Sequence, residues 1–144
     1  MLIVVLASLL LIALTTVVHY EALRIIYAAL PSLAIPMRYK LLVVIFGALA
    51  AHFLEITVYG GALYMLIHYL GVGGLTGESQ TFEACLYFSA ETYTSLGLGD
   101  VKPIGHLRLL AGVEALNGLL LIGWSASFTY IEMERFWSSK GAKD

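Results

Sequence analysis

Three long runs of apolar residues, separated by polar or glycine-rich stretches, dominate the chain. The first covers residues 1–30 and ends near Pro31, which lacks the amide that a helix interior needs. The second covers residues 41–70 and the third covers residues 106–136. Because a helix needs about 20 apolar residues to cross a bilayer, each run predicts a transmembrane helix.

The first run could also be a secretory signal peptide. That interpretation fits poorly, because no positive residue precedes the apolar core and no clear small-residue cleavage site follows it. The pattern therefore favours a retained N-terminal transmembrane helix over residues 1–30.

The positive residues predict the orientation of the three helices. Arg38 and Lys40 lie in a short polar loop at residues 31–40, and a basic tail follows at residues 138–144. Positive residues concentrate on the cytoplasmic side, so we expect both segments to lie there. With three spans, the N-terminus and the glycine-rich loop 71–80 are then expected on the outer side of the cell membrane.

The composition supports a membrane protein and excludes several other classes. Hydrophobic residues make up 60% of the chain and charged residues 12%, an apolar excess that lipid or a large interface must cover. A net charge of -2 without a basic run argues against a nucleic-acid partner. One cysteine, Cys85, excludes an internal disulfide, and four scattered histidines indicate no metal cluster.

A short segment between the second and third runs carries the most specific pattern. Residues 81–93 are too few to span a bilayer and predict a re-entrant helix with Thr81 as its N-cap. In the stretch that follows, Gly97 and Gly99 alternate with larger residues. Glycine permits backbone angles that turn successive carbonyls to one side, and such backbone is tolerated at membrane depth where it lines an aqueous cavity.

The stretch from Glu91 to Pro103, ETYTSLGLGDVKP, resembles the pore loop of the potassium channel family, whose filter typically reads TVGYGD. Six residues occupy those places without a gap: Ser95, Leu96, Gly97, Leu98, Gly99 and Asp100. Residues 86–92 resemble the aromatic pair and Ser-x-Glu-Thr upstream of that filter, and the resemblance covers residues 41–137.

This resemblance implies an all-α membrane fold of three transmembrane helices, a re-entrant pore helix and an extended filter, with the pore helix and filter at residues 81–100. It also implies assembly as a fourfold homotetramer in the lipid bilayer. Potassium ions in the filter are the only bound cofactor expected, and the resemblance places them at Ser95, Leu96, Gly97 and Leu98.

Two filter residues depart from the family pattern. Ser95 replaces the usual threonine but keeps the hydroxyl that can complete the innermost ion site. Leu98 replaces the usual tyrosine and loses a phenol that commonly bonds to aromatic residues of the pore helix. The second pore loop of two-pore-domain potassium channels has a similar Gly-Leu-Gly-Asp sequence, so leucine is compatible with selectivity.

The resemblance also suggests residues that support the filter and open the pore. Glu91, Thr94 and Asp100 are expected to brace the filter, although Asp100 could instead lie at the outer mouth. Gly118 lies where the family often has a gating hinge, although a glycine at this position could equally allow close packing between helices. Four residues of the last helix are expected to join it at the cavity and gate: Leu119, Ile122, Gly123 and Ala126.

Polar residues inside apolar spans are candidate functional residues. His52 and Glu55 share one helix face, and Glu114 and Asn117 share another. If these faces meet, they form a buried polar network that could tie gating to pH through His52. A packing network without any sensing role is the alternative.

One pore loop cannot surround an ion, so four copies are required. The leading hypothesis is passive potassium conduction, with a non-selective cation channel as its nearest rival. A non-conducting membrane subunit is another class, and a membrane enzyme using His52 and Glu55 is disfavoured because two residues make a poor metal site. The role of the first helix and any regulatory subunit stay open.

Overall fold

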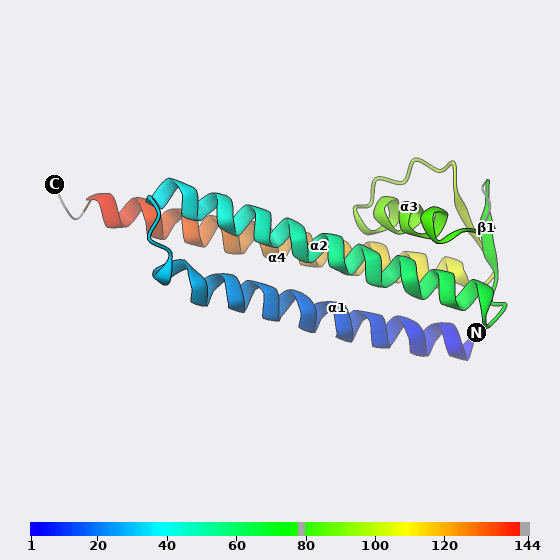
Figure 1. Ribbon diagram of the computed structural model, residues 1–144. Helices are drawn as coiled ribbons and strands as arrows, with labels where there is room; N and C mark the ends of the chain where they lie inside the picture. Colours follow the sequence, from blue (N-terminus) through cyan, green and yellow to red (C-terminus); the bar gives the residue numbers. More distant parts are fainter. Residues whose placement is uncertain (78–79, 142–144) are drawn as a thin grey trace.

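Three long helices lie side by side along the length of the molecule, and a short helix sits at one end of them (Figure 1). The computed structural model describes residues 1–77 and 80–141, with side chains up to Ser138. In chain order the elements are α1 (Leu2–Ala29), the 3-10 turn η1 (Leu30–Ser32), α2 (Met37–His68), β1 (Gly74–Thr76), α3 (Phe82–Tyr93), β2 (Lys102–Ile104) and α4 (Leu107–Gly141).

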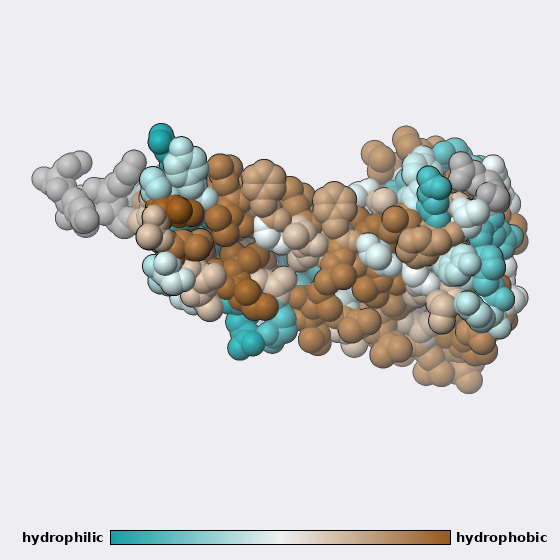
Figure 2. Space-filling view, in the orientation of Figure 1, coloured by the Kyte–Doolittle hydropathy of each residue, from teal (hydrophilic) through white to brown (hydrophobic). Residues whose placement is uncertain are grey.

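Within the described residues, three helices are long and apolar enough to cross a membrane, as the sequence predicted. They cover Leu2–Ser32, Met37–His68 and Leu107–Ser138. Hydrophobic side chains cover most of the long helical body in Figure 2, and polar ones gather around the end formed by α3 and β1. The protein is therefore a multi-pass membrane protein of mainly helical class.

Two helix boundaries differ from the predicted ones. The loop expected at residues 31–40 is shorter, because α2 begins at Met37 directly after Pro36 at its N-cap. Lys40 thus belongs to a helix, and its ammonium donates to the Leu30 carbonyl at 2.7 Å and so binds the end of the preceding helical turn. At the other end α4 runs to Gly141, into the segment expected to be a tail.

Parts of two predicted segments fall outside the description. Glu78 and Ser79 of the expected loop 71–80, and residues 142–144 of the expected tail, lie outside the described residues. In Figure 1 the N-terminus lies at the end of the molecule that carries β1, and α4 runs toward the opposite end.

A small antiparallel sheet, not predicted from the sequence, fixes where the re-entrant segment enters and leaves. β1 pairs with β2, with Gly74 opposite Ile104 and Thr76 opposite Lys102. Gly77 follows β1 with a φ of 96°, and a Cβ there would collide with the Asp100 carbonyl oxygen. The chain between the strands therefore starts and returns at one end of the molecule, as a re-entrant loop must.

α1 is part of the body of the fold, packed against both α2 and α4. Its buried residues recur every three or four positions and so form one helix face. They are Val4, Ser8, Leu11, Thr15, His19 and Leu23. Half of this face is polar, which means that α1 needs hydrogen-bonding partners as well as apolar contacts.

At Gly118, α4 lies close against the end of α3. A Cβ at Gly118 would collide with the carbonyl oxygen of Tyr93, the last residue of α3. The helix α4 is continuous through this position. Close packing thus accounts for the glycine in this structure, while its role as a gating hinge stays a prediction.

We expect Gly118→Ala to destabilise the fold, because its Cβ meets backbone that cannot swing aside. Overpacking of this kind costs about 1–3 kcal/mol of unfolding free energy. Thermal unfolding of the detergent-solubilised chain measures the effect, with Gly112→Ala as the matched control. Gly112 lies in the same helix with nothing within 4 Å of an added Cβ, so alanine there should be neutral or stabilising by up to about 1 kcal/mol. Equal melting temperatures for both variants would contradict the close-packing account.

Candidate functional site

The short helix α3 begins as its sequence predicted. The Thr81 side chain accepts a hydrogen bond from the Ala84 amide at 3.2 Å, which makes Thr81 the N-cap. Glu83 in the first turn adds a negative charge where the helix dipole is positive. The start of the re-entrant helix is therefore fixed by local chemistry.

The end of α3 is a Schellman motif that turns the chain into the glycine-bearing strand. Ser95 takes a φ of 58°, its amide donates to the Thr92 carbonyl at 3.0 Å, and the Leu96 amide donates to the Glu91 carbonyl at 2.9 Å. A β-branched residue is a steric outlier at positive φ, so serine suits this place better than the threonine of the family pattern.

Beyond Ser95 the backbone alternates in the sign of φ. Gly97 and Gly99 have φ values of 58° and 81°, whereas Leu96 and Leu98 do not have positive φ. Such an alternation can turn successive peptide groups to the same side. The two glycines are thus required by the conformation.

Glu91 receives the amides of this strand. The amides of Leu96 and Gly97 donate to its carbonyl at 2.9 and 3.4 Å, and the Leu98 amide donates to its carboxylate Oε1 at 3.0 Å. In a planar trans peptide the carbonyl points opposite to the amide. The carbonyls of Ser95, Leu96 and Gly97 therefore face away from α3, on the side opposite to Glu91.

This carbonyl-bearing strand is exposed within the single chain. All residues from Ser95 to Asp100 are exposed, and Leu96 and Leu98 are 65% and 64% accessible. The side chains of two leucines and a row of carbonyls thus lie open on the same segment. The described part of the chain contains nothing that covers them.

Three residues expected to support this strand take different partners. Glu91 is buried and binds the strand, as described above. The Thr94 hydroxyl donates to the Ala90 carbonyl at 2.7 Å, so it caps α3 rather than the strand. Asp100 accepts from the Tyr87 hydroxyl at 2.9 Å and from the Val101 amide at 3.0 Å. The Tyr87 hydroxyl is the main cause that lowers the pKa of Asp100 below its ordinary value.

The residues expected at the cavity and gate lie on two faces of α4. Gly118 is buried against α3, while Leu119, Gly123 and Ala126 are exposed and Ile122 is half-buried. Three of the five thus lie away from the packed interior of their own chain, while Ile122 packs against the core. Their contact with a central cavity stays a prediction.

The buried polar residues do not meet as the sequence suggested. Asn117 donates to the Thr15 hydroxyl at 2.8 Å and to the Tyr59 hydroxyl at 3.1 Å, so it joins α4 to α1 and α2. Glu114 accepts from the Ser89 hydroxyl at 2.5 Å, which joins α4 to α3. Among the described residues, Glu114 and Asn117 therefore bond to α1, α2 and α3 through Thr15, Tyr59 and Ser89, and not to His52 or Glu55.

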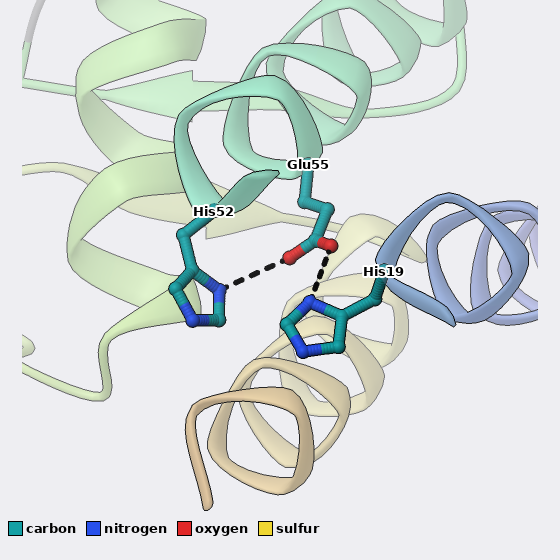
Figure 3. A group of neighbouring side chains, drawn as sticks. All are labelled: His19, His52 and Glu55. Carbon is teal, nitrogen blue, oxygen red and sulfur yellow. Dashed lines mark hydrogen bonds and ion pairs between the residues drawn. The ribbon is translucent and has the colours of Figure 1, made fainter. Parts of the chain in front are cut away.

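His52 and Glu55 instead belong to a separate cluster that includes His19 of α1 (Figure 3). The Glu55 carboxylate lies between the two imidazoles, 2.9 Å from His19 Nδ1 and 3.1 Å from His52 Nδ1. The Tyr93 hydroxyl donates to Glu55, and Ser125 of α4 binds both imidazoles. Spacing along the sequence connected only His52 with Glu55. His19, Tyr93 and Ser125 lie on three other helices, and the sequence did not predict how those helices pack against α2.

We expect Tyr87→Phe to raise the pKa of Asp100 toward its ordinary value of 3.8, because the hydroxyl that stabilises the carboxylate is lost. A depressed carboxyl pKa contributes stability above its unfolded value, and that contribution disappears as the pH falls through the folded pKa. The variant should therefore lose this contribution at higher pH than the wild type. Carboxyl carbon shifts of Asp100, followed below about pH 5 by NMR, measure the change.

The control for this experiment is Tyr69→Phe, which removes an exposed phenol at the end of α2. It should leave the Asp100 titration as in the wild type. An Asp100 pKa that is the same in Tyr87→Phe and in the wild type would show that the hydrogen bond does not hold the carboxylate.

Of the comparisons with known proteins, only the one with protein families gives a match, and it covers the part of the chain that holds this site. No curated protein and no solved structure matches the chain. A family model described as an ion channel matches residues 39–135, which take in most of α2, all of α3 and both strands, and most of α4. α1 lies outside the match. Because the match covers more than half of the chain, the protein belongs to the ion channel family that has the potassium channel pore domain.

Proposed function

We propose that this protein is a potassium channel in which four copies surround one pore. The stretch from Ser95 to Gly99 is its selectivity filter, and the filter carbonyls replace the water around a potassium ion. The chain lies in the cell membrane with its N-terminus outside and its C-terminus in the cytoplasm. No catalytic residue or organic cofactor is part of this function.

The direction of the strand carbonyls is the observation that carries the proposal. Three consecutive amides end on Glu91, so the carbonyls of Ser95, Leu96 and Gly97 share the opposite direction. Oxygen atoms aligned in this way form a cation path rather than an anion site. The C-terminal end of α3 lies beside them, and its dipole is negative.

The exposure of the same strand supports assembly. A single chain leaves these carbonyls and the side chains of Leu96 and Leu98 open, although irregular backbone at membrane depth must be buried or line water. Closed cyclic symmetry brings the same strand of each copy to one axis. Four copies would cover the leucines and leave only the carbonyls facing the ion.

Ion flux into liposomes containing the purified protein tests the proposal. We expect potassium to pass and barium to block it, while sodium does not pass. Gly97→Ala should abolish the flux, because alanine is strained at a φ of 58° and the carbonyl row would turn. Gly71→Ala is the matched control, since Gly71 has a φ of 59°, nothing within 4 Å of an added Cβ and a place outside the filter.

A non-selective cation channel is the second candidate, and Leu98 is the reason. Its side chain is 64% exposed, and a leucine has no phenol with which to tie the strand to α3. Equal flux of sodium and potassium would establish this candidate and overturn potassium selectivity. Absence of any flux at all pH values, together with a mass below four chains, would instead indicate a non-conducting subunit.

Glu91→Ala should alter the open probability of single channels while leaving their ion preference largely intact. The alanine removes the acceptor of the Leu98 amide, yet the backbone carbonyl at position 91 still holds the amides of Leu96 and Gly97. Glu91→Gln keeps an acceptor oxygen and should restore most of the wild-type behaviour. Planar-bilayer recording measures both, and wild-type gating in Glu91→Ala would contradict the role of the carboxylate.

A further inference from the structure

A polar cluster near the middle of the spanning helices is not used by the proposed conduction path. His19 and Glu55 are fully buried, and the His52 side chain is 13% exposed. His19 comes from α1, which lies outside the matched family region, whereas His52 and Glu55 come from α2. The cluster therefore joins the additional helix to the pore domain.

The hydrogen bonds of the cluster close a ring through four side chains. Glu55 contacts Nδ1 of each imidazole at 2.9 and 3.1 Å. On the other side the Ser125 hydroxyl lies 3.2 Å from Nε2 of His19 and 3.1 Å from Nε2 of His52. Each imidazole thus has one nitrogen on Glu55 and one on Ser125, and His52 Nδ1 also lies 2.9 Å from the Tyr93 hydroxyl.

With Glu55 ionised, the hydrogens of the cluster do not fill this ring. Four contacts need four hydrogens, whereas Ser125 and two neutral imidazoles supply one each and the carboxylate supplies none. The Tyr93 hydrogen is already directed at Glu55. An ionised Glu55 therefore leaves the ring one hydrogen short, and either a proton on the carboxylate or a metal cation at one of the contacts completes it.

The charge of the cluster leads to the same requirement. An ionised Glu55 between two neutral imidazoles carries one negative charge into an apolar span, which is costly without a partner. Among the described residues its ion-pair partners are His19 and His52, with no lysine or arginine. A cation between the carboxylate and the two imidazoles would supply both the charge and the fourth contact.

We propose that His19, His52 and Glu55 bind a divalent transition-metal ion, with Zn²⁺ as the ion that suits them best. Imidazole nitrogen and carboxylate oxygen are ligands that zinc prefers. One donor atom from each of the three residues lies within 4.8 Å of the others. Tetrahedral zinc holds its ligand atoms roughly 3.3–3.6 Å apart, so only a small side-chain adjustment is needed.

Ser125 and Tyr93 are placed to orient these ligands. If both Nδ1 atoms bind the metal, both Nε2–H groups donate to the Ser125 oxygen, whose two lone pairs accept them. Tyr93 donates to the carboxylate, as groups around metal-bound carboxylates commonly do. The arrangement thus fixes the tautomers that metal binding requires, without any further residue.

One side of the cluster borders a hollow. His52 and Tyr93 help to line this apolar hollow, which has a volume of about 390 Å³. A metal bound in the cluster would fasten α1 to α2 and restrain Tyr93, the last residue of α3. Metal occupancy would therefore stabilise the chain where the filter strand begins.

Zinc binding to the purified, metal-depleted full chain in detergent tests the proposal. We expect one Zn²⁺ per chain by elemental analysis after gel filtration, and a rise in melting temperature of about 5–10 °C at saturating Zn²⁺. Glu55→Gln and His19→Ala should lose both. Ser125→Ala should weaken binding by about 10- to 100-fold, because it removes the group that orients both imidazoles. His106→Ala changes an exposed histidine outside the cluster and should bind as the wild type does.

The remaining outcomes overturn the proposal. Zinc lost equally in His106→Ala, or retained in Glu55→Gln, would place the metal elsewhere. A wild-type chain that retains no Zn²⁺ and shows no change in melting temperature would exclude a metal site even if every variant failed to fold. If its melting temperature then depends on pH while that of Glu55→Gln does not, a proton occupies the ring instead of a metal.

Discussion

The structure depends on the bonding of one acidic residue, Glu91, to the backbone that follows it. Its backbone carbonyl accepts the hydrogen bond that closes the Schellman motif at the end of α3. Its carboxylate accepts a hydrogen bond from the amide of Leu98, further along the loop. An exposed carboxylate could not do this reliably, but Glu91 is 5% exposed and held on a helix. Because the amides of Leu96, Gly97 and Leu98 all point to Glu91, the carbonyls of the preceding residues point in the opposite direction.

That arrangement works only if the end of α3 is itself held in place. Gly118 lets α4 approach the Tyr93 carbonyl, and Gly60 lets α2 approach the backbone of Leu86, where a Cβ would lie 3.0 Å from the Leu86 Cα. The pairing of β1 with β2 holds the two ends of the loop together. The backbone geometry of the stretch from Ser95 to Gly99 therefore depends on close contacts of α3 with α4 and α2 and on the pairing of the two strands.

The sequence predicted what depends on local chemistry. Apolar length gave the three spans, Thr81 gave the start of α3, and the alternating glycines gave the conformation of the strand. The short strands escaped prediction because three residues of Gly-Leu-Thr or Lys-Pro-Ile carry no alternating pattern, and their stability comes from pairing with each other. The pairing of buried polar residues also escaped, since it depends on how α1 and α3 pack.

α1 shows why those polar residues occur together. Its inner face presents Ser8, Thr15 and His19, of which Thr15 accepts from Asn117 and His19 binds Glu55. Without α1, Asn117 would lose one partner and Glu55 another inside an apolar span, where an unmet polar group is costly. The polar residues of α2 and α4 are thus matched to a helix outside the family's common region. Any ion or proton held between His19, His52 and Glu55 must act on that helix and on Tyr93 at the same time, because Glu55 is bonded to both.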